Sequence, residues 1–446
     1  MVLVLLLISL FIPSQASFVA GGLAFSCYRL VIIIFFVPAC LRIMSQRFGK
    51  AGWVDLAMLA TSTWFVIATT RNDGLSRGIE AGGASALDFF GTYVLLRAYV
   101  TKESHIVWIA RFLAIGITMI APFMVIESLT GQHVLKDLVT TLIGGNFYIT
   151  PDQRWGFERA WGPFDHPILA GVITSTAISL VWFSNLRRPA WQKLAWIAGP
   201  VIATVSTFSS GALASMVIQF GCIAWYYTAA NLRRKWLWLG MGLLAFYLSI
   251  EVLSNRSAYA VLISYLTFNP HTGFYRVEIF HWGFYYNILR EPIFGIGESN
   301  WIRAAWMYSG SVDNFWLKIT MDRGIPVFVM VLTAVLITFL GQRRKPFGTS
   351  DVRLGWTLSM IAICFAGLTV HFWNHSFVWF SFFLGIGVTW LHPSPPARSA
   401  VAGGGPRYQR VGRGVRENRS NRGPVAIEGG RDERFAKRFK GERAGD

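Results

Sequence analysis

The feature that most constrains this chain is a series of long apolar runs. They are about 17 to 25 residues long, the length that crosses a bilayer as an α-helix, and they recur as far as residue 391. Only 14% of the residues are charged, against about 25% in soluble globular proteins. Stretches such as 106–126 do not alternate apolar and polar residues, which argues against a transmembrane β-barrel. The sequence therefore predicts an all-α, polytopic membrane protein.

Hydropathy predicts about twelve transmembrane helices within residues 1–392. These spans cover 2–25, 29–44, 53–70, 83–100, 105–127, 166–185, 191–208, 211–230, 236–253, 324–341, 354–372 and 374–391. If every span crosses once, the short basic connections share one face, and the positive-inside rule places that face and both termini in the cytoplasm. The two long connections, about 128–165 and 254–323, then lie on the opposite face, which is periplasmic for a bacterial inner-membrane protein. Long loops in compact proteins are usually functional, so we expect the chemistry there.

The C-terminal segment, residues 393–446, has a different composition. It holds thirteen basic and six acidic residues of a chain whose net charge is +18, and it is rich in Gly, Pro, Arg and Ser. Such a segment cannot bury enough apolar surface to fold alone, so we predict a disordered basic cytoplasmic tail. It could contact anionic lipid headgroups or remain solvated. Because so much of the charge lies in this tail, the net charge does not indicate nucleic-acid binding.

The first long loop ends in an unusual stretch, RWGFERAWGPFDHP, at 154–167. Arg is always charged and presents a planar fork of donors, so Arg154 and Arg159 suit a phosphate or pyrophosphate at the bilayer surface. The alternative is a plain surface loop with a Glu158–Arg159 ion pair. Pro167 can open the next helix, with Asp165 or His166 as its cap.

The second long loop is dense in Phe, Tyr and Trp between residues 269 and 287. Aromatic rings favour the headgroup zone, so this stretch predicts a helix lying in the interface, with Arg276 at headgroup depth. Further along, Asp313 has no obvious local partner and is a candidate general base. Lys318 and Asp322 lie four residues apart on a predicted helix and are expected to pair with each other.

Metal chemistry finds little support in the sequence. His371 and His375 have the i, i+4 spacing of two zinc ligands, but the glutamate of an HExxH motif and a third ligand are missing. Packing and turn hydrogen bonds explain the pair better. We predict neither a metal nor a cofactor.

Several short motifs occur in an order that resembles the O-antigen ligase and O-antigen polymerase family of bacterial polytopic membrane proteins. The motifs are FDHP at 164–167, SSGA at 209–212, TGFYR at 272–276, PIFGIG at 292–297, DNFWL at 313–317 and GIP at 324–326. Each is short, and their order and spacing carry the resemblance, which covers about residues 130–340.

This resemblance implies a membrane glycosyltransferase fold and activity, without metal or nucleotide. Members transfer a glycan from undecaprenyl pyrophosphate to an acceptor glycan or glycolipid at the periplasmic face. Arg154 or Arg159, together with Arg276, resemble the family's pyrophosphate-binding arginines. Where ligases of the family carry a His, this chain has Asp313, which favours a polymerase or ligase of exopolysaccharide or capsule-like glycans. Membrane lipids and other polysaccharide assembly proteins are further candidate partners.

The leading hypothesis is therefore glycosyl transfer in the biosynthesis of a surface polysaccharide such as O-antigen, lipopolysaccharide or exopolysaccharide. A flippase or exporter of lipid-linked sugars is the alternative, although transporters tend to place ionisable residues near the midplane. A non-catalytic scaffold is a third interpretation. The residues predicted to act in catalysis are Asp313, Arg276, Arg154 and Arg159, and those predicted to contact the substrate are His166, Asn314, Glu158, Trp161, Tyr275 and His281.

Overall fold

The computed structural model describes residues 1–20, 23–45, 52–143, 151–266, 270–298, 301–307, 309–341 and 351–391. The predicted tail at 393–446 lies outside the described residues. Within them the chain is mostly helical, and five helices are long and apolar enough to cross a membrane. These are α2 (Cys27–Met44), α3 (Trp53–Asp73), α7 (Glu103–Thr130), α9 (Pro167–Ser184) and α12 (Lys235–Leu253). The all-α membrane fold is thus supported, whereas the number of spans, about twelve, stays a prediction.

The N-terminal segment departs from the predicted helix over 2–25. Helix α1 (Val2–Ser9) is short, and it is followed by an antiparallel hairpin of β1 (Ser17–Ala20) and β2 (Leu23–Ser26). Pro13 lacks a backbone N–H and disfavours a helical conformation of the residue before it, so an apolar composition was not enough to continue the helix. Leu6 and Leu7 are fully buried, and α1 packs on α2 and α6 (Thr92–Tyr99).

The predicted span over 83–100 belongs to a longer helical run that contains two π-helical segments. The run consists of α4 (Leu75–Arg77), η1 (Gly78–Gly82), α5 (Gly83–Ala86), η2 (Leu87–Gly91) and α6. Gly78 and Gly82 approach α3 closely, since a Cβ at Gly78 would overlap the Thr70 side chain and one at Gly82 would crowd the backbone of α3. Small residues at such positions let two membrane helices pack against each other.

Helix α9 forms the centre of the described core. It is 89% buried, and it packs against α7, α10 (Ala190–Ser206), α11 (Ser210–Thr228) and α17 (Asp351–Ala366). The last described α-helix is α18 (His375–Gly387), which continues in a short 3₁₀ turn, η5 (Val388–Trp390). Because α9 begins at Pro167, the end of the first long loop is fixed to the most buried of the five helices that are long and apolar enough to cross a membrane.

The two long loops contain structure of their own. The first holds α8 (Val134–Ile143) and a two-residue hairpin of β3 (Gln153–Arg154) and β4 (Phe157–Glu158). The second holds α13 (Ala258–Leu266), α14 (Pro270–Trp282) and η3 (Gly283–Ile288), and it leads into α15 (Phe315–Arg323) and α16 (Ile325–Gly341). The helix predicted within 269–287 is confirmed by α14 and η3, and its depth in the bilayer stays a prediction.

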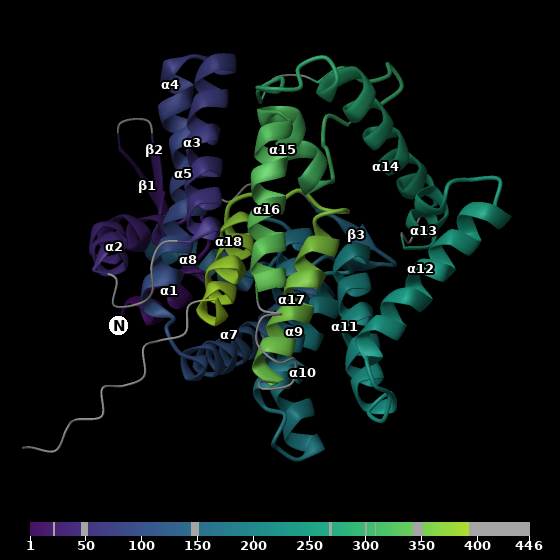
Figure 1. The fold of residues 1–446 in the computed structure, drawn as a ribbon. Helices are drawn as coiled ribbons and strands as arrows, with labels where there is room; N and C mark the ends of the chain where they lie inside the picture. Colours follow the sequence, from purple (N-terminus) through teal and green to yellow (C-terminus); the bar gives the residue numbers. More distant parts are fainter. Residues whose placement is uncertain are drawn as a thin grey trace, which may run out of the picture. The chain divides into compact units, whose positions relative to one another are not determined.

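The elements of the second loop lie along one side of the helical core. In Figure 1, α12, α13 and α14 follow one another at the right of the view, while α15 lies above α9 and α17. The loop has its own small apolar cluster, to which α14, η3, α15 and the segment before α15 contribute. Its buried members are Ile279, Ile288, Trp301, Met307, Val312, Leu317 and Met321. This cluster fixes α14 relative to the N-terminus of α15.

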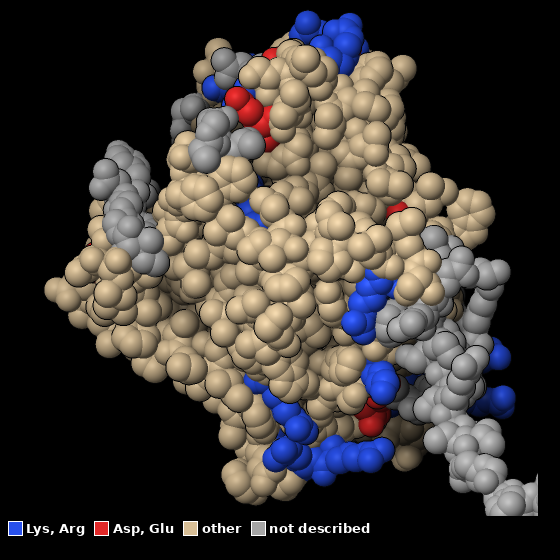
Figure 2. Space-filling model, turned by 90° about the vertical axis from the view of Figure 1, so that its left-hand side faces the viewer, with Lys and Arg blue, Asp and Glu red and all other residues tan. Residues whose placement is uncertain are grey.

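The described surface carries few charges over most of the face seen in Figure 2. Much of the middle of that face is uncharged, and Lys and Arg side chains gather at its lower end and at its top. This distribution fits a protein whose middle contacts hydrocarbon and whose ends meet water.

Candidate functional site

The hairpin of the first loop holds Arg154 in a fixed turn. Gln153 pairs with Glu158 and Arg154 with Phe157, so the connection is the two residues Trp155 and Gly156. Both have positive φ, 53° and 84°. Such a turn reverses the chain sharply, and its cost for a bulky residue such as Trp155 indicates that contacts around the hairpin hold it.

Both arginines of this loop are anchored to the turn between α10 and α11. Arg154 Nη1 donates to the carbonyl oxygen of Phe208 at 2.9 Å, and Arg159 Nε donates to that of Thr207 at 3.2 Å. The backbone N–H of Ala160 donates to Ser206 O at 3.0 Å. The turn between α10 and α11, next to the SSGA motif at 209–212, therefore supports the loop that carries the two arginines.

The acidic partner of Arg159 is not the one expected from the sequence. Arg159 Nη1 forms an ion pair with Asp152, whereas Glu158 Oε1 accepts a hydrogen bond from the Asp152 backbone N–H at 2.8 Å. The Glu158–Arg159 pair that the sequence offered as an alternative is thus replaced by Asp152–Arg159. Burial lowers the pKa of Arg159, and the charge of Asp152 partly opposes this effect. Arg159 Nη2 is buried without a hydrogen-bond partner in the part of the chain that the structure describes.

Helix α8 adds a cation that sequence reasoning missed. Lys136 is 1% exposed, and its ammonium lies 3.8 Å from the centre of the Trp161 ring. Burial lowers the pKa of Lys136 to about 8, although Glu127 and Asp165 oppose the shift. The amphipathic pattern of 134–143 was the available signal, since it places one lysine on an otherwise apolar face.

The loop around Trp161 is attached to the end of α7. Glu127 accepts hydrogen bonds from the backbone N–H groups of Trp161 at 2.7 Å and Gly162 at 3.0 Å, and His133 Nδ1 lies 2.5 Å from the same carboxylate. A buried carboxylate that accepts two backbone hydrogen bonds and has an imidazole beside it is a firm anchor. The indole N–H of Trp161 is buried and has no hydrogen-bond partner within the described ranges.

His166 caps α9, as the sequence predicted for one of two residues. Its Nδ1 accepts a hydrogen bond from the Ile168 N–H at 3.2 Å. Burial, with the charge of Arg159 adding to it, lowers the pKa of His166 to about 4. The ring is therefore neutral at pH 7 and carries its proton on Nε2. It lies between the indoles of Trp161 and Trp373, at 5.4 and 5.9 Å between ring centres.

The second loop brings Arg276 and Asp313 to the same place. Burial lowers the pKa of Arg276, the charges of Asp313 and Tyr259 raise it, and the charge of Arg154 lowers it. The charge of Arg276 also lowers the pKa of Arg159, and the charge of Asp313 raises the pKa of His166. We call this group the arginine site. Its members are Lys136, Arg154, Arg159, His166, Arg276 and Asp313.

Within the arginine site, Arg276 and Asp313 keep free capacity for a ligand. Arg276 Nε is buried without a hydrogen-bond partner, and no carboxylate lies within ion-pair distance of Arg276 or Lys136 among the described residues. Asp313 Oδ1 accepts a hydrogen bond from the Ser311 hydroxyl at 2.7 Å. The arrangement is a cluster of cations with one carboxylate beside it. The cations suit an anionic ligand, and the carboxylate suits a proton transfer to or from a group next to that anion.

Three of the predicted substrate contacts have other uses. Asn314 caps α15, because its Oδ1 accepts a hydrogen bond from the Leu317 N–H at 3.0 Å. The Tyr275 hydroxyl donates to Ser309 O at 3.0 Å. His281 is exposed, and its ring contacts Tyr285 and Tyr286 on the following turn. Trp161 and Glu158, by contrast, lie in the loop that carries the arginines, Glu158 being buried.

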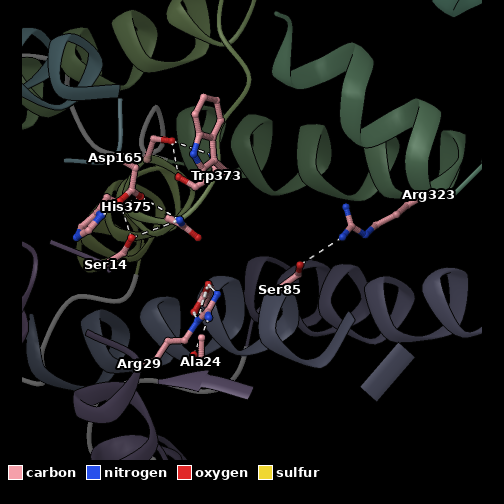
Figure 3. Close-up of polar contacts among 11 residues, drawn as sticks. Ser14, Ala24, Arg29, Ser85, Asp165, Arg323, Trp373 and His375 are labelled. Atoms are coloured by element: carbon pink, nitrogen blue, oxygen red, sulfur yellow. Dashed lines mark hydrogen bonds and ion pairs between the residues drawn. The ribbon is translucent and has the colours of Figure 1, made fainter. Parts of the chain in front are cut away.

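A second polar cluster adjoins the arginine site through Trp373. Asp165 accepts hydrogen bonds from the hydroxyl of Ser14 and from Asn374 Nδ2 at 2.9 Å, and His375 Nδ1 lies 3.5 Å away. Figure 3 shows these groups converging on Asp165. Burial raises the pKa of Asp165, but His375, Ser14 and Asn374 outweigh it and bring the pKa to about 2. His375 thus lies beside a carboxylate, and no group that could hold a metal is found among the described residues.

Next to this cluster lies a cavity of about 380 Å³, which we call the paired pocket. Its charged groups form ion pairs across its wall: Arg29–Asp88 at 2.7 Å, Lys318–Asp322 at 2.6 Å and Arg323–Glu298 at 3.7 Å. The predicted Lys318–Asp322 pair is confirmed. Arg323 also donates to the Ser85 hydroxyl at 3.3 Å (Figure 3). One signal in the sequence was overlooked: Arg29 and Asp88 interrupt apolar runs, where ionisable residues need partners.

Comparisons with known proteins add no further assignment. No family model matches this chain, and no curated protein matches it.

Proposed function

We propose that the chain is a membrane glycosyltransferase that polymerises or ligates an undecaprenyl-pyrophosphate-linked glycan. The observation that carries this proposal is the electrostatic interaction that links Arg154, Arg159 and Arg276, from two loops far apart in the sequence, with one another and with the carboxylate of Asp313. A pyrophosphate leaving group needs cations, and an attacking hydroxyl needs a base. The arginine site offers both in one place.

In the proposed reaction the acceptor hydroxyl attacks the anomeric carbon of the lipid-linked sugar. The new carbon–oxygen bond forms as the bond to pyrophosphate breaks, and one displacement inverts the anomeric centre. Asp313 accepts the hydroxyl proton, while the arginines stabilise the charge that develops on the pyrophosphate. His166 is neutral and donates only through Nε2, so it is suited to hold a sugar hydroxyl rather than the anion.

The five apolar helices support a membrane location. We place the protein in the bacterial inner membrane, with the arginine site on the periplasmic side and both termini in the cytoplasm. Partners under this proposal are the lipid-linked donor, an acceptor glycan or glycolipid, membrane lipids and other polysaccharide assembly proteins.

The test is reconstitution of the purified full chain with a lipid-linked oligosaccharide, with products identified by mass spectrometry. Release of undecaprenyl pyrophosphate with longer glycans indicates a polymerase, and transfer to an added acceptor lipid indicates a ligase. Asp313→Asn is expected to slow turnover by about a hundredfold or more, the range for loss of a general base. The matched control is Arg290→Ala, an exposed residue of the same loop. Glycan that crosses the bilayer without covalent change would support the transporter alternative and contradict the proposal.

A further inference from the structure

A polar cavity lies at the opposite end of α9 from the arginine site. Its volume is about 380 Å³, and it is lined by the first turns of α7, the turn after α9 and the start of α17. Helix α9 has 18 residues, which span about 27 Å at 1.5 Å per residue, close to the hydrocarbon thickness of a bilayer. If the arginine site lies at one headgroup layer, this cavity lies at the other.

Three polar atoms in the cavity wall are buried and have no hydrogen-bond partner within the described residues. They are Arg111 Nε, Ser184 Oγ and Asn185 Oδ1. Buried polar groups nearly always have partners, so three orphaned atoms in one cavity indicate a ligand. Arg111 requires an acceptor, Asn185 Oδ1 requires a donor, and Ser184 can serve as either. The matching ligand is an anion that also carries hydroxyl groups.

The carboxylates near the cavity are already engaged. Glu103 accepts a hydrogen bond from Trp390 Nε1 at 3.3 Å, and its charge acts on Arg353. Asp351 is hydrogen-bonded to the hydroxyl of Tyr226. Both acids line the cavity and keep their charge, but the three arginines Arg111, Arg187 and Arg188 outnumber them. Neither acid forms an ion pair with one of these arginines among the described residues.

The cations of the cavity keep donors for an anion. Arg187 is exposed, and Arg188 uses Nη1 for a 3.1 Å hydrogen bond to Gln192 while its guanidinium lies 5.8 Å from the centre of the Trp196 ring. With Arg111, three arginines surround the cavity. Guanidinium groups bind phosphate oxygens in pairs, which makes phosphate the preferred anion.

The surroundings favour a lipid over a soluble phosphate. Trp108, on the next turn of α7 from Ser104, is 40% exposed, and Trp191 at the start of α10 is 68% exposed. Exposed tryptophans concentrate at headgroup depth. Basic pockets between transmembrane helices on the cytoplasmic side are a known form of headgroup recognition.

We propose that this cavity binds the headgroup of phosphatidylglycerol. The phosphate contacts Arg111 and Arg188, and a glycerol hydroxyl donates to Asn185 Oδ1. Soluble glycerol phosphate has the same polar chemistry, and the two sources differ in whether an acyl chain is required. The inference does not depend on the proposed glycosyl transfer, because the site lies at the other end of α9.

The test is lipid binding to the full chain in detergent, followed by native mass spectrometry and by thermal stability. Phosphatidylglycerol is compared with phosphatidylcholine and with soluble glycerol phosphate, at high salt to screen the exposed charges of the chain. Arg111→Gln is expected to weaken phosphatidylglycerol binding about tenfold, the size for loss of one charge-assisted hydrogen bond. The control is Arg233→Gln, an exposed arginine on the same predicted face but outside the cavity, which is expected to bind as the wild type does.

A second variant guards against misfolding. Arg188→Gln leaves Arg111 in place and is expected to weaken binding to a similar degree. Equal binding of phosphatidylglycerol by both variants and the wild type would overturn the proposal, and so would equal binding of phosphatidylcholine. If glycerol phosphate stabilises the protein as strongly as the lipid does, the ligand is the soluble phosphate and the lipid assignment is wrong.

Discussion

The arginine site and the paired pocket use the same kinds of side chain in opposite ways. In the paired pocket the side-chain nitrogen of each lysine or arginine lies within 3.7 Å of a carboxylate oxygen. In the arginine site, Arg276 and Lys136 have no such partner among the described residues, and Arg159 keeps one nitrogen unpaired. Paired charges hold elements together, whereas unpaired buried cations keep their binding capacity for an anion. The comparison thus distinguishes charged groups that pair with each other in the paired pocket from cations of the arginine site that have no carboxylate partner among the described residues.

The largest effect should come from removing an unpaired cation. Arg276→Ala is expected to lower the rate of glycan transfer by about a hundredfold or more, as loss of a preorganised group that stabilises developing charge does. The unfolding midpoint should change little, because Arg276 has no ion-pair partner among the described residues that its removal would leave unpaired. The measurement is product formation in vesicles beside denaturant unfolding of the same preparation. Normal glycan transfer by a correctly inserted variant would contradict the role of Arg276.

Removing one partner of an ion pair in the paired pocket should lower stability more than activity. Asp88→Asn leaves Arg29 without its carboxylate, and Asp88 is 2% exposed. Breaking one partner of a buried ion pair costs about 3 kcal/mol of stability. Urea unfolding in detergent is the measurement, and the double variant Asp88→Asn with Arg29→Met is the control that should recover part of the loss. Unchanged stability together with lost activity would remove the distinction between the two regions.

Asp165 offers a pH-dependent test of the cluster between them. Its pKa is about 2 in the folded protein against an ordinary value of 3.8, so its contribution to stability is present above pH 4. The contribution is lost as the pH falls toward 2, and it amounts to about 2 kcal/mol. Unfolding free energies measured from pH 5 down to pH 2 should fall more steeply for the wild type than for Asp165→Asn. Parallel curves would show that Asp165 is not held by Ser14, Asn374 and His375.

The smallest expected effect concerns Lys136. Because burial lowers its pKa to about 8, the ammonium loses its proton as the pH rises through that value, and the arginine site loses one charge. Affinity for undecaprenyl pyrophosphate should then fall about tenfold between pH 7 and pH 9, by analogy with one charge-assisted contact. Lys136→Arg, which stays charged, should bind independently of pH over this range. The comparison is made by titration of the lipid at each pH, and a pH step that persists in the variant would assign the effect to another group.

The sequence anticipated the parts of the site that are local. The His166 cap of α9, the Lys318–Asp322 pair and the helix within 269–287 all depend on residues within a few positions of one another. The failures share the opposite property. The helix expected over 2–25 stops before Pro13, and Arg159 pairs with Asp152 rather than with its neighbour Glu158. Apolar composition does not tell a spanning helix from a short helix followed by a hairpin, and adjacent residues in an extended chain point to opposite faces.

By itself, the sequence determined that the protein is helical, that much of it is apolar enough to be embedded in a membrane, and that two polar loops interrupt the apolar runs. These properties follow from hydropathy and local spacing, which are additive along the chain. Only the tertiary structure decided that Arg276 and Asp313 meet Arg154 and Arg159, that Lys136 joins them, and that Arg29 is paired with Asp88. Such groupings depend on which helices pack against α9 and on which carboxylates lie within ion-pair distance, and no short stretch of sequence contains that information.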